Sequence, residues 1–120
     1  MIEKINLKQK FESIRDYWNP RVAGEVNESY VKLVKFQGPF EWHHHDDEDE
    51  MFLVVNGRFT MRLKDGDVTV EEGEFVIVPK GVEHCPVADH EVSVLLFEPK
   101  TTLNTGNVRN ERTKEKLERI

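Results

Sequence analysis

The sequence of 120 residues is poor in three things: cysteine, long apolar runs and basic charge. Cys85 is the only cysteine, so no disulfide can form within the chain, and we expect a reducing, cytoplasmic setting. No apolar run approaches the ~18 residues of a membrane span, and the polar start of the chain is unlike a signal peptide. The formal net charge of −6 argues against nucleic-acid binding, which needs a basic surface.

The composition is that of a globular protein, and its hydrophobic pattern changes along the chain. Hydrophobic residues make up 38% and charged residues 33% of the sequence, which predicts one domain, 1–120, with a single core. We divide it into an N-terminal helix within 1–20, a set of strands over 21–99, and a C-terminal loop and tail over 100–120. The charged stretch 111–120 is helix-prone, and we expect a short helix there.

The N-terminal helix is indicated by apolar residues at helical spacing, namely Ile5, Leu7, Phe11, Ile14 and Trp18. Asn6 can cap its first turn, with Gln9 three positions on, as in a capping box. Asn19-Pro20 would end it, because proline cannot continue a helix. We expect this helix to cover an apolar face of a sheet.

Strands are indicated between residues 21 and 99, where the hydrophobic period becomes two. The runs 30–36 and 58–64 alternate, and in the second run Phe59 and Met61 would face the core. Nearly continuous apolar runs predict strands buried on both faces, and they lie at 51–55, 75–78 and 92–97. Short turns such as Asn56-Gly57 separate the runs, which predicts an antiparallel sandwich or jelly roll of about eight strands.

Three histidines and one glutamate lie at a spacing that can form one metal site: His43, His45, Glu50 and His84. His43 and His45 are two residues apart, so in a strand both imidazoles would point the same way. Glu50 begins one apolar run, and His84 follows the turn after another. This mixed nitrogen and oxygen set suits a divalent transition metal, Fe, Mn, Ni or Zn, and would leave coordination positions open.

Two further carboxylates belong to the same hypothesis. Asp49 is an alternative ligand to Glu50, because the spacing of the motif allows either residue. Glu41 shares the strand phase of His43 and His45, so it is a candidate catalytic base in the pocket. The alternative interpretation of Glu41 is a solvated residue at the end of a strand.

This spacing resembles the two sequence motifs of the cupin family. The first, H-x-H, three or four residues, E, six residues, G, is matched by His43, His45, Glu50 and Gly57. The second, G, five residues, P-x-G, two residues, H, is matched by Gly73, Pro79, Gly81 and His84. The second motif usually ends with an asparagine, and this chain has Ala88 in its place.

The resemblance implies an all-β fold, the cupin double-stranded β-helix or jelly-roll barrel, flanked here by the N-terminal helix and the helical tail. It also implies His43, His45, Glu50 and His84 as metal ligands. Cupins include dioxygenases, isomerases and non-catalytic modules, so the fold does not fix the reaction. We expect a small-molecule substrate and isomerase- or dioxygenase-like activity, with a non-catalytic sensing module as the alternative. The likeness to mannose-6-phosphate isomerase-like cupins is distant. Strands apolar on both faces predict a homodimer.

Overall fold

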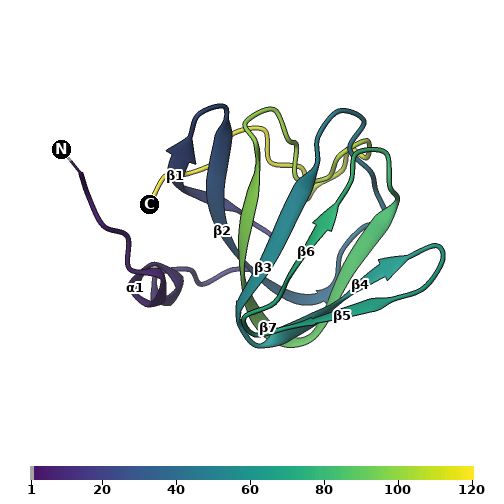
Figure 1. Cartoon of the computed structure of the whole chain (residues 1–120), viewed down its shortest axis with the longest axis horizontal. Coiled ribbons are helices and arrows are strands. Elements are labelled where there is room, and N and C mark those ends of the chain that lie inside the picture. Colours follow the sequence, from purple (N-terminus) through teal and green to yellow (C-terminus); the bar gives the residue numbers. More distant parts are fainter. Residues whose placement is uncertain (1) are drawn as a thin grey trace.

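The computed structural model describes residues 2–120, and Met1 lies outside the described residues. These residues form one short helix and, as expected, an antiparallel β-structure (Figure 1). In chain order the elements are α1 (Leu7–Glu12), β1 (Arg21–Val26), β2 (Ser29–Pro39), β3 (Glu50–Asn56), β4 (Arg58–Leu63), β5 (Val68–Glu71), β6 (Phe75–Val78) and β7 (His84–Pro99). No helix in this part of the chain has the length and apolar character needed to cross a bilayer.

The 16-residue strand β7 organises the sheet. Its first residues pair with β4, and its second half pairs with β2 on one side and with β3 on the other. The strand order is β1-β2-β7-β3-β6, and the β4–β5 hairpin joins through the first part of β7. Register shifts between Phe36 and Gly38 and between Val54 and Asn56 mark bulges, which bend strands. The sheet therefore curls around its own core as the predicted jelly-roll barrel (Figure 1).

The core fills the inside of this barrel through strand alternation. On β3 the side chains of Phe52 and Val54 are buried, whereas those of Met51 and Leu53 lie on the outer face and are half-buried. Phe59 and Met61 on β4 are 2% and 0% exposed, which confirms the predicted inward face of that strand. Each such side chain contributes roughly 1.5–3 kcal/mol by leaving water.

Helix α1 is shorter than predicted. Asn6 caps it, with Oδ1 accepting the Gln9 backbone N–H at 3.0 Å, but the helix ends at Glu12. Trp18 lies beyond it in the left-handed region, with φ of 59°. Its indole enters the barrel and stacks on Phe36 at 4.3 Å, so its helical spacing in the sequence is misleading. We also predicted that this helix covers an outer face of the sheet, and that prediction is confirmed.

That covered face carries a second, smaller cluster. Phe11 from α1 and Ile14, just after it, pack on Leu33 of β2, which has 0% exposure. In Figure 1, α1 lies beside the barrel at the end where β2, β3 and β7 converge. The helix is thus a local cover for one part of the outer face.

The helical tail predicted for 111–120 is wrong, because this stretch contains turns and extended backbone. The Val22 N–H donates to the carbonyl of Glu118 at 2.9 Å, and the Ile120 N–H donates to the carbonyl of Val22 at 3.0 Å. The tail therefore pairs with the edge of β1, where those backbone groups have partners that a helix would remove. Ile120 also packs against the cluster under α1.

Candidate metal centre

The structure brings His43, His45, Glu50 and His84 together inside the barrel, and one ligand atom from each lies within 4.8 Å of all the others. Glu50 is the first residue of β3, and His84 is the first residue of β7. His43 and His45 come from the segment between β2 and β3. All four are buried, with exposures of 2%, 4%, 4% and 0% in chain order.

The segment that carries the two histidines is not a regular strand, contrary to expectation. His43 makes an isolated antiparallel bridge with His84, with N–H···O distances of 3.0 and 2.9 Å in the two directions. The carbonyl of His45 accepts the Gly81 N–H at 2.7 Å. This bridge and this single bond hold the segment extended enough that both imidazoles face inward, with ring centroids 5.1 Å apart.

Backbone carbonyls determine the tautomer of two imidazoles, those of His43 and His84. Nδ1 of His43 lies 2.8 Å from the carbonyl of Glu41, and Nδ1 of His84 lies 2.8 Å from that of Val82. A carbonyl only accepts, so each Nδ1 carries the proton and each Nε2 keeps its lone pair for a metal.

The donor atoms at the centre of this cluster lack partners. Among the described residues, His45 Nε2, His84 Nε2 and Glu50 Oε1 are buried without a hydrogen-bond donor or acceptor suited to them. Glu50 Oε1 lies 3.2 Å from His45 Nε2 and 3.5 Å from His84 Nε2. Buried polar atoms without partners are rare, and a cation between them would satisfy all three. The residues present therefore fit a divalent transition metal.

The electrostatics of the cluster favour the metal-binding protonation states. Burial, and then the charge of His84, lowers the pKa of His43 to about 4, so its imidazole is neutral near pH 7. Burial alone would raise the pKa of Glu50, but its interactions with the side chains of Glu98, His45 and His84 outweigh burial and hold that pKa well below the usual value. Burial, and then the neighbouring Glu50 carboxylate, raises the pKa of Glu98 well above its usual value. Glu50 is thus the ionised member of the carboxyl pair.

A narrow cavity opens beside the cluster. Its empty volume, including the mouth, is about 380 Å³, but the part that water can occupy is about 30 Å³. The wall is aromatic, formed by Trp18, Phe36, Phe40 and Phe52, and His43, Glu50 and Glu98 supply polar groups. His43 and Glu50 thus present the open side of the cluster to a small ligand. Sequence analysis had placed Trp18 on the helix and so missed it as a wall of this cavity.

The C-terminal loop closes over the cluster, which sequence analysis did not anticipate. The Asn107 N–H donates to the carbonyl of His44 at 3.0 Å, and Asn107 Oδ1 accepts the His44 N–H at 2.8 Å. Gly106, with φ of 56°, lies so close to His44 that a Cβ would collide with its carbonyl oxygen. Figure 1 shows this loop, in yellow, along the end of the barrel where β3 begins. The only signal in the sequence was the glycine-containing stretch Asn104-Thr105-Gly106-Asn107.

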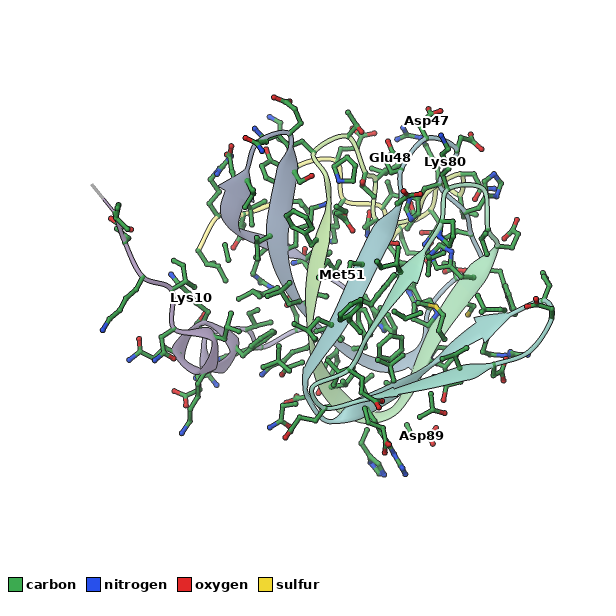
Figure 2. All side chains as sticks on the ribbon, in the orientation of Figure 1. Lys10, Asp47, Glu48, Met51, Lys80 and Asp89 are labelled. Carbon is green, nitrogen blue, oxygen red and sulfur yellow. The ribbon has the colours of Figure 1, made fainter. Side chains whose placement is uncertain are left out.

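The acidic loop before β3 lies at the same end of the molecule, where Figure 2 labels Asp47, Glu48 and Lys80. Asp49, the alternative ligand, is outside the cluster: its Oδ1 accepts the Lys80 N–H at 2.9 Å. Glu48 accepts a hydrogen bond from the Thr101 hydroxyl at 2.7 Å. The acidic side chains of this loop therefore hold it to the backbone of Lys80 and to the side chain of Thr101. Of Asp49 and Glu50, only Glu50 reaches the cluster.

Glu41 and Ala88 take other positions. The Glu41 carboxylate lies 4.0 Å from Arg112 Nε, its side chain is 35% exposed, and it is not part of the cavity wall. Its backbone carbonyl is the group that holds His43. Ala88, where the motif has asparagine, is 1% exposed and belongs to the barrel core.

Comparison with known proteins agrees with this architecture. Residues 31–98 match the Cupin_2 model of the cupin domain. A cupin-2 domain containing protein from Shewanella frigidimarina is 42% identical, with a TM-score of 0.79 over 80% of this chain and 94% of that one. The protein NMB1881 from Neisseria meningitidis is 35% identical, with a TM-score of 0.75 over 82% of this chain and all of that one, 100%.

Curated relatives match over part of their length. The uncharacterized protein YdbB of Bacillus subtilis is 39% identical over 61 residues, which are 50% of this chain and 54% of that protein. The 3-hydroxyanthranilate 3,4-dioxygenase of Xenopus tropicalis is 26% identical over 101 residues, 78% of this chain and 36% of the enzyme. The chain thus spans about half, or less, of the length of these relatives.

Proposed function

The chain belongs to the Cupin_2 family, and we propose that it binds one divalent transition metal and uses it on a small organic molecule. The proposed ligands are His43, His45, Glu50 and His84. The observation that carries the proposal is the group of buried donor atoms without partners at the centre of the barrel. A metal would give these atoms the partner that they lack.

The ligand set narrows the choice of metal. Imidazole nitrogens with one carboxylate suit Fe(II), Mn(II), Ni(II) or Zn(II) better than Ca(II), which prefers oxygen ligands. A bound metal would supply Lewis-acid or redox chemistry. His43 and Glu50 line the cavity, so a ligand would approach the metal from that side. The small space open to water favours a small ligand, or a slender group of a larger one.

Dioxygenase-like chemistry is the form of activity that we propose first. Support comes from the relatives named 3-hydroxyanthranilate 3,4-dioxygenase, with which this chain shares 26% identity. Isomerase-like chemistry would need a base, and Glu41 is the proposed candidate if its side chain turns from Arg112 towards the cavity. A non-catalytic binding module remains the alternative, because the cavity is narrow and its wall is mainly aromatic.

We also propose a homodimer formed through the outer face of β3 and β6. Phe75 and Ile77 on β6 are 59% and 54% exposed, and they pair with Leu53 and Met51 of β3. This row of apolar side chains continues to Phe97 of β7, which pairs with Met51, and it lies beyond the area that α1 covers. An apolar face of this kind on an edge strand fits a second copy of the chain. A reducing cytoplasm is part of the proposal, because the single thiol, Cys85, is free and buried.

Elemental analysis of freshly purified, untagged protein tests the metal site. We expect near-stoichiometric iron, manganese, nickel or zinc in the wild type and its loss from the His43→Ala/His84→Ala variant. The matched control is His90→Ala, which removes an exposed histidine of β7. A wild type that holds no metal and takes up none on titration contradicts the proposal.

Oxygen consumption then separates the dioxygenase from the alternatives. Protein reconstituted with Fe(II) without air is mixed with 3-hydroxyanthranilate, or with a panel of small phenols and carbonyl compounds, in an oxygen electrode. Uptake that depends on both metal and substrate supports the oxygenase. Metal-dependent rearrangement of the ligand without oxygen uptake favours the isomerase. Metal-dependent binding with neither oxygen uptake nor product favours the binding module.

A further inference from the structure

A hydrogen-bonded lysine–glutamate pair lies inside the barrel behind the cavity, and the proposed function gives it no role. Lys32 of β2 and Glu98 of β7 are 1% and 2% exposed, and Lys32 Nζ lies 2.5 Å from Glu98 Oε2. Lys32 Nζ also donates to the carbonyl of Thr102 in the C-terminal loop at 3.4 Å. Removing an ammonium group and a carboxyl group from water is costly, and apolar side chains in such a place often give equal or higher stability. Stability alone therefore does not explain this pair.

The strand register places Glu98 beside the metal ligand Glu50. Phe52 of β3 pairs with Leu96 of the antiparallel strand β7. Two residues further along this pairing, Glu50 and Glu98 come side by side, both pointing inward because side chains alternate. Both residues line the cavity. The two carboxyl groups are near enough that each shifts the pKa of the other, that of Glu50 downwards and that of Glu98 upwards.

The two oxygens of Glu98 have different surroundings. Oε2 is fixed by Lys32, whereas Oε1 has no N–H or O–H donor among the described residues and is buried. The Lys32 ammonium thus holds one side of the carboxyl group, and the other side is left for Glu50. Lys32 thus contacts Glu98, Glu98 lines the same cavity as Glu50, and Glu50 lies beside His45 and His84.

We propose that Glu98, fixed by Lys32, is a positioning residue that orients the Glu50 carboxylate towards His45 and His84 for metal binding. Ligating carboxylates depend on such partners, and losing one typically lowers metal affinity roughly 10–100-fold. The inference rests on the proposed metal site and adds to it the two residues that hold its only carboxylate. It also gives a reason for a buried lysine–glutamate pair in the apolar core.

The test uses Co(II) as the probe, because its visible spectrum reports ligand geometry as well as binding. In the Lys32→Met/Glu98→Leu variant both polar groups are replaced by apolar groups of similar size, so neither is left buried without its partner. We expect this variant to fold, to bind Co(II) at least 10-fold more weakly, and to show an altered Co(II) spectrum. Glu98→Gln keeps a donor towards Glu50 and an acceptor for Lys32, and we expect affinity within about threefold of wild type.

The matched control is Lys100→Met/Glu25→Gln, which removes an exposed ion pair of 2.8 Å away from the cavity and should leave Co(II) binding unchanged. Metal-free denaturation curves show whether each variant is folded. Wild-type Co(II) affinity and spectrum in a folded Lys32→Met/Glu98→Leu variant would overturn the inference while leaving the proposed function intact. Failure of the wild type to bind Co(II) or any other divalent metal would overturn both. If the charge-free variant does not fold, Glu98→Leu alone is compared with Glu98→Gln by the same titration, and equal affinities overturn the inference.

Discussion

Gly106 in the C-terminal loop lies against the backbone carbonyl of His44. In the sequence, His44 separates two of the proposed metal ligands, His43 and His45. Its φ of 56° and the absence of a side chain together allow this approach. Asn107, the next residue, hydrogen-bonds to both the N–H and the carbonyl of His44. A loop more than 60 positions away in the sequence therefore fixes the backbone on which His43 and His45 are mounted.

Replacing Gly106 with alanine should destabilise the protein by at least about 2 kcal/mol, because a Cβ there meets a backbone atom that cannot move easily. The metal affinity should fall with it. Gly73→Ala is the matched control, because Gly73 also has a positive φ, 82°, but has open space around its Cβ position. Chemical denaturation and metal titration of both variants measure the difference. Equal losses in the two variants would mean that the contact with His44 contributes nothing beyond backbone strain.

Replacing His84 with alanine should remove the metal and leave the barrel folded. The imidazole is fully buried, so its loss leaves a cavity worth roughly 2–3 kcal/mol, well within the stability of an ordinary domain. Circular dichroism and metal analysis of His84→Ala, beside His90→Ala, check both halves of the prediction. An unfolded metal-free variant would show that the metal is structural and that the site is not an open one.

The stability of the metal-free protein should depend on pH through His43. Its pKa is lowered to about 4 from an ordinary value of 6.5, mainly by burial. Between these values the unfolded chain binds a proton that the folded protein excludes. The stability that depends on His43 being neutral is therefore fully present above pH 6.5 and is lost as the pH falls through about 4.

Comparison of wild type with His43→Gln isolates this effect, because the shifts at Glu50 and Glu98 are expected to act in both proteins. Between about pH 7 and about pH 4, wild type should lose on the order of 3 kcal/mol more stability than the variant. Urea denaturation of chelator-treated protein at a series of pH values gives the two curves. Parallel curves would refute the assignment of this proton uptake to His43.

Replacing Ile77 with glutamate should convert the proposed dimer into a monomer, because it places a charge in the centre of the apolar face on β3 and β6. Light scattering after size-exclusion chromatography measures the mass. Val26→Glu, at a similarly exposed residue of β1, is the control and should remain dimeric. A wild type that runs as a monomer of 14.1 kDa at micromolar concentration would exclude the dimer.

The site and the inward faces of the strands could be predicted because they depend on local pattern. Strand alternation placed Phe59 and Met61 in the core, and the family motif selected the four residues that the structure brings together. The choice of Glu50 over Asp49 also rested on alternation, since Phe52 continues inward from Glu50. Strand alternation and each of the two motifs span only a few neighbouring residues, although the fold is needed to bring His84 to the other three ligands.

The features that sequence analysis missed depend on contacts between distant segments. Trp18 fits the helical period, yet its indole is stacked on Phe36 in the barrel, because burial there outweighs the weak preference for another helical turn. The charged tail has helix-forming residues, but pairing with the edge of β1 satisfies its backbone. The pair of Lys32 and Glu98, 66 residues apart, could not be expected, because nothing local requires a buried lysine.

The long strand β7 has a consequence for how the protein folds during synthesis. β2, β3 and β4 all hydrogen-bond to this one strand, which is synthesised after all three of them. A nascent chain that ends before His84 therefore holds three strands without their common neighbour, and one proposed ligand is missing as well. The barrel and its metal centre should appear together, late and in one cooperative step, with the slow folding expected of a topology dominated by distant pairings.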